Sequence, residues 1–191
     1  MSLEASRAAA VGARDRAIVE RQLGRAPHAV SGVAARCPFG FVAVVEDLPY
    51  DERGAPFPTL FYATCPTLVQ ALSRLEDGGG VREWSARVGR EPELLASLRD
   101  AERYERRRRR TLAARCAATP RDGGASLALG VAGVRRRDRT DLKCLHAHAA
   151  HALARPRYLL GRLILEQAGD LWCDNERCGD ANPAVAEETL G

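Results

Sequence analysis

The stretch that decides the fold is residues 32–49, GVAARCPFGFVAVVEDLP. Two runs rich in valine and alanine flank Cys37-Pro38-Phe39-Gly40, in which proline is second and glycine fourth, as a type I turn prefers. This pattern predicts a β-hairpin whose turn begins with a cysteine.

A third strand and a helix follow the hairpin. Residues 57–64, FPTLFYAT, are rich in β-prone side chains and predict a strand. Pro66 suits the first position of a helix, so Cys65 is the expected N-cap. The helix should end at the three glycines 78–80. Its buried stripe is expected at Leu68, Val69, Leu72 and Leu75.

The rest of the chain predicts mostly helices. They are expected at residues 13–23, from 81 to about 118, from about 141 to 154 and from 157 to 168, with a linker at 119–126. The predicted fold is therefore α+β, a small antiparallel sheet of about three strands covered by helices. We expect one domain over residues 15–168, between a flexible N-terminus (1–14) and a polar, loose C-terminal tail (169–191).

Composition is that of an ordinary soluble protein, with 46% hydrophobic and 28% charged residues and a net charge of +4. The first 15 residues lack the apolar core of a signal peptide, and no apolar run approaches the roughly 18 residues of a membrane span. We therefore expect a cytoplasmic protein that does not enter a membrane. In a reducing compartment its six cysteines are thiols or metal ligands rather than disulfides.

Residues 143–154, KCLHAHAAHALA, contain three of the four histidines and the only lysine of the chain. On a regular helix, Cys144, His148 and His151 share a side nearly opposite the leucines, and His146 lies at the edge of the leucine side. Their neighbours on that side are alanines rather than charged residues, so we expect a helix buried on both sides. Lys143 is a candidate anion-binding residue, because a compact ammonium is retained in a chain that otherwise uses arginine.

Spacing limits which of these residues can share one metal ion. Side chains three or four positions apart on a helix are close enough, which admits Cys144 with His148 or His148 with His151 but not Cys144 with His151. The remaining donors would be Cys37 and Cys65, each held at a turn by the proline that follows it. Thiolate and imidazole ligands suit zinc or an iron–sulfur cluster. Alternatively, both cysteines are small buried hydrophobic residues.

Other features give weaker signals. The arginine runs 106–110 and 135–137 have no interleaved aromatic residues, which disfavours nucleic acid and leaves an acidic protein as a possible partner. Cys173 and Cys178 have a spacing that could fit zinc, but two thiols in a loose tail explain it equally. The motifs GxxxxGK[ST], GxSxG and HExxH are absent, as is a GxGxxG after a strand, which argues against the corresponding enzyme classes.

The segments IVERQLGRAP, GVAARCPFG, PFPTLFYATCP, GVAG and KCLHAHAAHALA together resemble a bacterial family known as "domain of unknown function 501", found largely in actinobacteria. The resemblance covers about residues 15–165 and carries no assigned activity. It implies that Cys37, Cys65, Cys144, His146 and His151 match the family pattern. It places an aliphatic residue at position 148 in other members and implies a later helix start, with Cys144 and His146 in a turn. Helical geometry favours His148 instead, so the histidine that joins Cys144 is left open.

The residues leave three hypotheses about function. The first is a metal site built from Cys37, Cys65, Cys144 and a histidine of the 146–151 cluster, either structural or catalytic. The second is a metal-free thiol enzyme in which Cys65 or Cys144 acts with His151. The third is an interaction module whose arginine-rich helix binds an acidic partner or nucleic acid. Sequence alone does not name a reaction or a substrate.

Overall fold

The computed structural model describes residues 11–27, 29–134 and 140–179. Within these residues it confirms the predicted α+β class and the three-stranded antiparallel sheet, whose order is β1-β2-β3. The elements are α1 (Ala13–Leu23), β1 (Val30–Arg36), β2 (Val42–Asp47), β3 (Phe61–Ala63), α2 (Pro66–Asp77), α3 (Gly80–Arg90), α4 (Pro92–Ala113), the 3₁₀ turns η1 (Ala125–Ala128) and η2 (Val131–Gly133), α5 (Leu145–Ala154) and α6 (Leu159–Ala168).

The hairpin forms where the sequence predicts it. The backbone N–H of Gly40 donates to the Cys37 carbonyl at 2.9 Å and closes the turn, and the Cys37 N–H donates to the Phe41 carbonyl at 2.9 Å. Gly40 has a φ of +82°, which a side chain would disfavour. β1 and β2 then pair in an antiparallel register that sets Val33 opposite Val45.

The third strand is shorter than predicted: β3 begins at Phe61 rather than at residue 57. Pro58 has no N–H to give to a ladder, and the carbonyls of Phe57 and Pro58 accept hydrogen bonds from the Arg109 guanidinium instead. Residues 57–60 therefore form a loop held by α4 rather than the first half of a strand.

Helix α2 matches the prediction at both ends. Cys65 is its N-cap, Pro66 is its first residue, and Leu68 and Leu72 are fully buried. The glycines beyond Asp77 end α2, but they do not form a long loop, since α3 already begins at Gly80.

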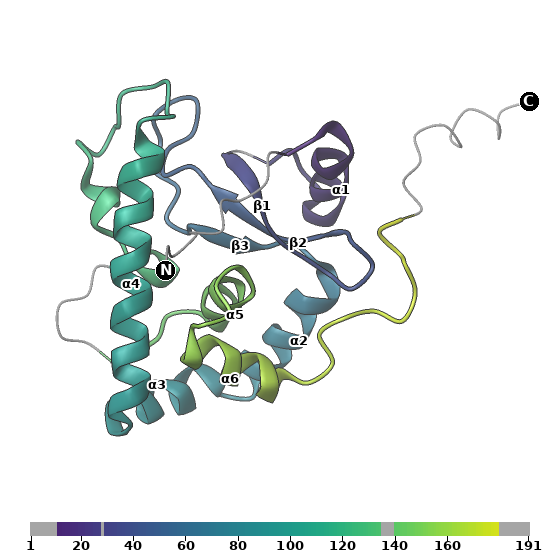
Figure 1. Cartoon of the computed structure of the whole chain (residues 1–191), viewed down its shortest axis with the longest axis vertical. Helices are drawn as coiled ribbons and strands as arrows, with labels where there is room; N and C mark the ends of the chain where they lie inside the picture. The colour runs from purple at the N-terminus through teal and green to yellow at the C-terminus, as the bar shows by residue number, and fades with distance from the viewer. Residues whose placement is uncertain (1–10, 28, 135–139, 180–191) are drawn as a thin grey trace, which may run out of the picture.

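Helices cover both faces of the sheet (Figure 1). Helix α1 packs on one face through Val19, which clusters with Val33, Val42 and Val45. Helix α5 lies against the other face, where it contacts β3, and its opposite side packs on α6. The long helix α4 runs along the flank, and α2 and α3 complete the layer around α5. Helix α5 is thus the centre of the main core.

The start of α5 differs from the prediction. A helix from about residue 141 was expected, but the helix begins at Leu145 with Cys144 as its N-cap. The N–H of Leu142 donates to Ser85 Oγ at 2.8 Å, and that of Leu145 donates to Glu76 Oε1 at 2.5 Å. Because these partners come from α3 and α2, tertiary contacts set the helix start. The later start matches what the family resemblance implied for Cys144, whereas His146 lies inside the helix.

The arginine run on α4 is not a uniform basic stripe. Arg108 forms a double hydrogen bond to Glu46 at 2.6 and 2.7 Å, and Arg106 lies 3.8 Å from Glu102. Arg109 is fully buried. The second basic run, 135–137, lies outside the described residues, as do residues 1–10 and 180–191 of the predicted termini.

The first part of the tail contacts the body of the protein. Leu171 and Trp172 pack on the main core, and the Sγ of Cys178 accepts a hydrogen bond from Gln22 of α1 at 3.4 Å. Within the described residues, no helix combines the length and apolar character needed to cross a membrane.

Candidate metal centre

Three side chains that can bind a metal meet at the start of α5. The Sγ of Cys144, a ring nitrogen of His146 and a carboxylate oxygen of Glu76 all lie within 4.8 Å of one another. The Nδ1 of His146 is 3.1 Å from Glu76 Oε1 and 3.7 Å from Cys144 Sγ. All three side chains are partly buried, so the group is sheltered but open to small molecules.

The contacts of the second ring nitrogen of His146, Nε2, determine which nitrogen is left to bind a metal. Nε2 lies 3.1 Å from the carbonyl oxygen of Val69 and 3.3 Å from Ser73 Oγ, both on α2. A carbonyl oxygen only accepts hydrogen bonds, so Nε2 must carry a hydrogen. Nδ1 then either holds a proton or offers its lone pair to a metal. A histidine ligand usually donates its other N–H to such a backbone carbonyl, which orients the ring.

Glu76 joins the group because α2 and α5 meet at this point. It lies in the last turn of α2, and its Oε1 accepts the free N–H of Leu145 in the first turn of α5. A carboxylate at a helix N-terminus is favoured by the helix dipole. Glu76 therefore both caps α5 and faces the donor atoms of Cys144 and His146.

The surroundings of His146 favour its protonated form when no metal is present. Its hydrogen bond with Cys144, reinforced by the charges of Cys144 and Glu76, raises the pKa of His146 to about 9 despite its burial. A proton on Nδ1 can thus occupy the place between the three donors that a cation would take.

A small hollow adjoins the group. It has a volume of about 300 Å³ and is lined by Cys144 and His146 together with mostly apolar side chains. The other lining residues are Thr59, Phe61, Tyr62, Ala63, Val69 and Ala147. This volume is at the lower end of the range for small-molecule sites.

A family model described as "Protein of unknown function (DUF501)" matches residues 33–166 of the chain. The chain belongs to the DUF501 family. No curated protein and no solved structure matches it. The match includes the hairpin turn, β2, α2 and α5, so the whole Glu76–Cys144–His146 group lies inside the DUF501 domain.

The other two histidines of the DUF501 segment point to different partners. His148 is 1% exposed, and its Nδ1 is hydrogen-bonded to the Tyr158 hydroxyl at 2.6 Å. His151 is 2% exposed and donates from Nδ1 to Glu105 Oε1 at 2.9 Å. The structure thus places His146, rather than His148, beside Cys144. The late start of α5 explains the difference, because Cys144 precedes the helix and its thiol is not on the predicted helical side.

Cys37 and Cys65, the two distant cysteines predicted as ligands, are not brought into this group. Cys65 caps the beginning of α2 while Glu76 lies in its last turn, and 11 residues of helix at about 1.5 Å each put roughly 16 Å between them. Burial raises the pKa of the Cys65 thiol, which disfavours its thiolate. Cys37 starts the hairpin turn. The predicted set of two Cys-Pro cysteines with Cys144 is therefore not assembled in this structure.

Lys143 is exposed and immediately precedes Cys144. Its ammonium is thus free to reach solvent beside the group, and its role in binding an anion stays a prediction.

Among the described residues, all six cysteines are free thiols.

Glu76 is the site residue that the sequence did not reveal. It is 70 positions from His146 and ends an ordinary amphipathic helix, where a glutamate is usually solvated. A weak signal was present in the sequence. An acidic residue in the last turn of a helix interacts unfavourably with the helix dipole, which indicates that it has a partner outside its own helix.

Proposed function

We propose that this DUF501 protein binds zinc through Glu76, Cys144 and His146, and that a fourth position of the ion is open to the adjoining hollow. The observation that carries the proposal is the convergence of one donor atom each from Cys144, His146 and Glu76 within 4.8 Å, with Nδ1 of His146 nearest the thiol and the carboxylate and its Nε2 on the Val69 carbonyl. A neutral His146 oriented in this way presents its lone pair to the same point as the thiol and the carboxylate.

The chemistry of the donors favours zinc over an iron–sulfur cluster. Zinc accepts sulfur, nitrogen and oxygen ligands in one tetrahedral site. Iron–sulfur clusters are held mainly by several cysteine thiolates, and this group supplies one. Calcium and magnesium prefer oxygen ligands and would not recruit Cys144 or His146.

Three protein ligands with one open position is the arrangement of catalytic rather than structural zinc sites. Zinc would supply a Lewis acid at that position. Phe61, Val69 and Ala147 would hold a small, largely apolar molecule against it and restrict water in the hollow. Glu76 would keep α2 and α5 in place while its carboxylate balances the positive charge.

A metal-free thiol enzyme is the second candidate. The observation that favours it is the 3.7 Å distance between Cys144 Sγ and His146 Nδ1, with Cys144 at the N-cap of α5. Backbone N–H groups at a helix start and a protonated histidine both stabilise a thiolate. In this case the partner of the cysteine is His146, not the predicted His151.

One experiment separates the two. The protein is purified anaerobically without a metal-affinity tag, stripped with a chelator and titrated with zinc or with cobalt, whose visible spectrum reports thiolate ligation. We expect one equivalent to bind. Glu76→Gln, Cys144→Ser and His146→Asn should each weaken binding at least tenfold, because each removes one of three ligands. Cys116→Ser is the matched control, since Cys116 lies after α4 with its Sγ 3.8 Å from the Tyr50 carbonyl.

Failure to bind zinc or cobalt, or equal binding by the three variants and the control, would reject the zinc site. Rapid alkylation of Cys144 alone in the metal-free protein, lost in His146→Asn, would then support the thiol enzyme. A brown protein that loses its colour in Cys37→Ser and Cys65→Ser would instead restore the predicted Cys-Pro cysteines as ligands of a cluster.

A further inference from the structure

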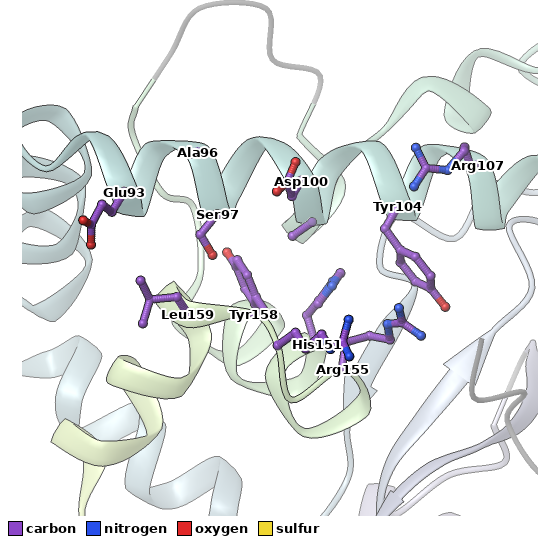
Figure 2. Close-up of a pocket in the computed structure, with 12 residues that line it drawn as sticks. Glu93, Ala96, Ser97, Asp100, Tyr104, Arg107, His151, Arg155, Tyr158 and Leu159 are labelled. Atoms are coloured by element: carbon purple, nitrogen blue, oxygen red, sulfur yellow. The ribbon is translucent and has the colours of Figure 1, made fainter. Parts of the chain in front are cut away.

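A second, larger pocket lies on the other side of α5. It has a volume of about 510 Å³ and is bounded by α4, the end of α5 and the start of α6. Figure 2 shows Ser97 and Tyr104 extending from α4 toward Tyr158, His151 and Arg155, with Asp100 and Arg107 on the same helix. This volume suits a small organic molecule. None of the three metal-site donors lines it.

The charges around the pocket favour an anion. Arg107, Arg155 and Arg157 line it, and none of the three forms an ion pair with any residue in the part of the chain that the structure describes. Two acidic residues, Glu93 and Asp100, also line the pocket, but Asp100 is already paired with Arg103 outside it. The lining therefore carries excess positive charge. Guanidinium groups bind phosphate and carboxylate oxygens in pairs.

The arginines in the pocket differ from their neighbours on α4. Arg106 lies beside Glu102 and Arg108 binds Glu46, while Arg107 is exposed and faces the pocket. Arg155 is held in place by stacking, with its guanidinium carbon 4.4 Å from the centre of the Tyr104 ring. Stacking leaves the edge of that guanidinium, which carries its N–H groups, available to a ligand.

The inner wall of the pocket is rigid and aromatic. His151 is fixed by its hydrogen bond to the buried Glu105, and its ring meets those of Tyr158 and Tyr104 edge to face, with centres 4.8 and 5.7 Å away. Tyr158 is itself hydrogen-bonded to His148. Buried polar groups of α4 and α5 thus hold the Tyr158 ring and the His151 imidazole beside the cationic rim.

From the cationic rim and the aromatic wall together, we infer that this pocket binds a small organic anion, with a phosphate or carboxylate on Arg107, Arg155 and Arg157 and an apolar or aromatic part against Tyr104 and Tyr158. The site is separate from the proposed zinc centre and does not depend on it. In this proposal the arginine run of α4 contributes one side chain, Arg107, to the pocket and does not act as a broad basic surface.

The test is calorimetric titration of the intact protein, in phosphate-free buffer at low salt, with phenyl phosphate, benzoate and uncharged phenol. We expect saturable binding of at least one anion and not of phenol, weakened by added salt. Arg107→Gln/Arg157→Gln should bind at least tenfold more weakly. Arg110→Gln is the matched control, because Arg110 is exposed on the same helix but does not line the pocket.

Comparison of the two anions identifies the headgroup, since tighter binding of phenyl phosphate points to a phosphate ester and tighter binding of benzoate to a carboxylate. Circular dichroism checks that the variants fold. Glu76→Gln should bind the anion like the unaltered protein, so a failure of the zinc site is distinguishable from a failure here. Absence of saturable binding by either anion, or equal binding by the double variant and the control, would overturn the inference.

Discussion

The guanidinium of Arg109 lies in the protein interior with 0% of its surface exposed. It donates to the carbonyls of Phe57 and Pro58, and the carboxylates of Glu105 and Asp47 are close enough to act on its charge. A buried cation of this kind persists only when it is well paired, because its transfer from water is costly. Arg109 therefore holds the loop before β3, which in turn places Phe61 beside the hollow of the metal centre.

We predict that Arg109→Gln lowers the free energy of unfolding by about 3 kcal/mol, because it leaves the buried Glu105 carboxylate without its cation and the carbonyls of Phe57 and Pro58 without donors. Arg110→Gln, at the next and exposed position, should change it by no more than about 0.5 kcal/mol. Urea denaturation followed by circular dichroism measures both. A loss below about 1 kcal/mol for Arg109→Gln would show that water or other groups replace its contacts.

Asp47 makes the stability depend on pH. Burial raises its pKa to about 8, against the opposing charge of Arg109. The folded protein therefore holds a proton on Asp47 between about pH 4 and pH 8, where the unfolded chain has lost it. The stability that this proton confers is complete below about pH 4, falls as the pH rises from 4 to 8, and is lost above pH 8.

We predict that Asp47→Asn removes this dependence. The free energies of unfolding of the two proteins, measured by urea denaturation from pH 5 to pH 8, should diverge by up to about 1.4 kcal/mol per pH unit, with the variant gaining relative to the unaltered protein as pH rises. The difference between the two curves isolates Asp47 from other titrating groups, including His146. Parallel curves would mean that Asp47 stays ionised in the fold.

Single residues also mark where prediction from the sequence ends. Cys65 and Pro66 at the start of α2 were predictable, since a cap and its helix are neighbours in the chain. Glu76 and Arg109 were not, because their roles depend on partners 70 and about 50 positions away. The sequence singled out Cys144 and His146, but only the fold shows that they meet a carboxylate rather than distant cysteines.

At the scale of elements, local signals and tertiary contacts give different results. The hairpin and α1 form where predicted, because turn residues and helical spacing act within a few positions. Helix α5 starts later than predicted because Ser85 binds the N–H of Leu142 in the segment before the helix and Glu76 binds the N–H of Leu145, its first residue. That shift moves Cys144 off the helix and selects His146 as its neighbour.

The packing of α6 on α5 depends on a glycine. A Cβ at Gly161 would overlap the carbonyl oxygen of His148 and lie 2.7 Å from both Ala152 Cβ and Tyr158 Cδ1. These distances are too short for van der Waals contact. The His148 carbonyl and Ala152 Cβ cannot move aside, because both are fixed by the backbone of α5. Gly161 therefore allows α6 to approach α5 and positions Tyr158 for both His148 and His151.

We predict that Gly161→Ala destabilises the protein by about 1–3 kcal/mol, as overpacked cores do, although alanine has the higher helix propensity. Gly89→Ala in α3 is the control, since a Cβ there meets only Thr140 Oγ1 at 3.6 Å and should leave stability unchanged or raise it by up to about 1 kcal/mol. Thermal denaturation compares the two. Stabilisation by Gly161→Ala would mean that the two helices are farther apart than described.

At the scale of the whole molecule, α5 connects the two proposed sites. Its start holds Cys144 and His146 at the metal centre, and its last turn holds His151 in the wall of the anion pocket. Phe61 lies between them, since it lines the hollow beside the metal centre and meets the His151 ring edge to face at 5.3 Å. The central position of α5 explains why both its sides are buried (Figure 1).

This arrangement makes the stability of the whole molecule a measure of metal binding. Glu76 and His146 are 70 positions apart, so the unfolded chain presents no assembled site and zinc should bind the folded state alone. Free zinc at 100 times its dissociation constant would then add about 2.7 kcal/mol to the free energy of unfolding. For a chain of 191 residues this corresponds to a rise in Tm of roughly 5–10 °C.

His146→Asn, with zinc affinity at least tenfold weaker, should cut this rise to about half or less, whereas Arg107→Gln/Arg157→Gln should retain it in full, because the pocket arginines touch none of the three donors. The converse holds for phenyl phosphate, whose stabilising effect should survive His146→Asn and disappear in the arginine variant. Differential scanning fluorimetry of the three proteins with each ligand gives the full comparison. If His146→Asn also lost the response to the anion, the two sites would be coupled through α5 and Phe61, and the independence argued from their separate linings would be wrong.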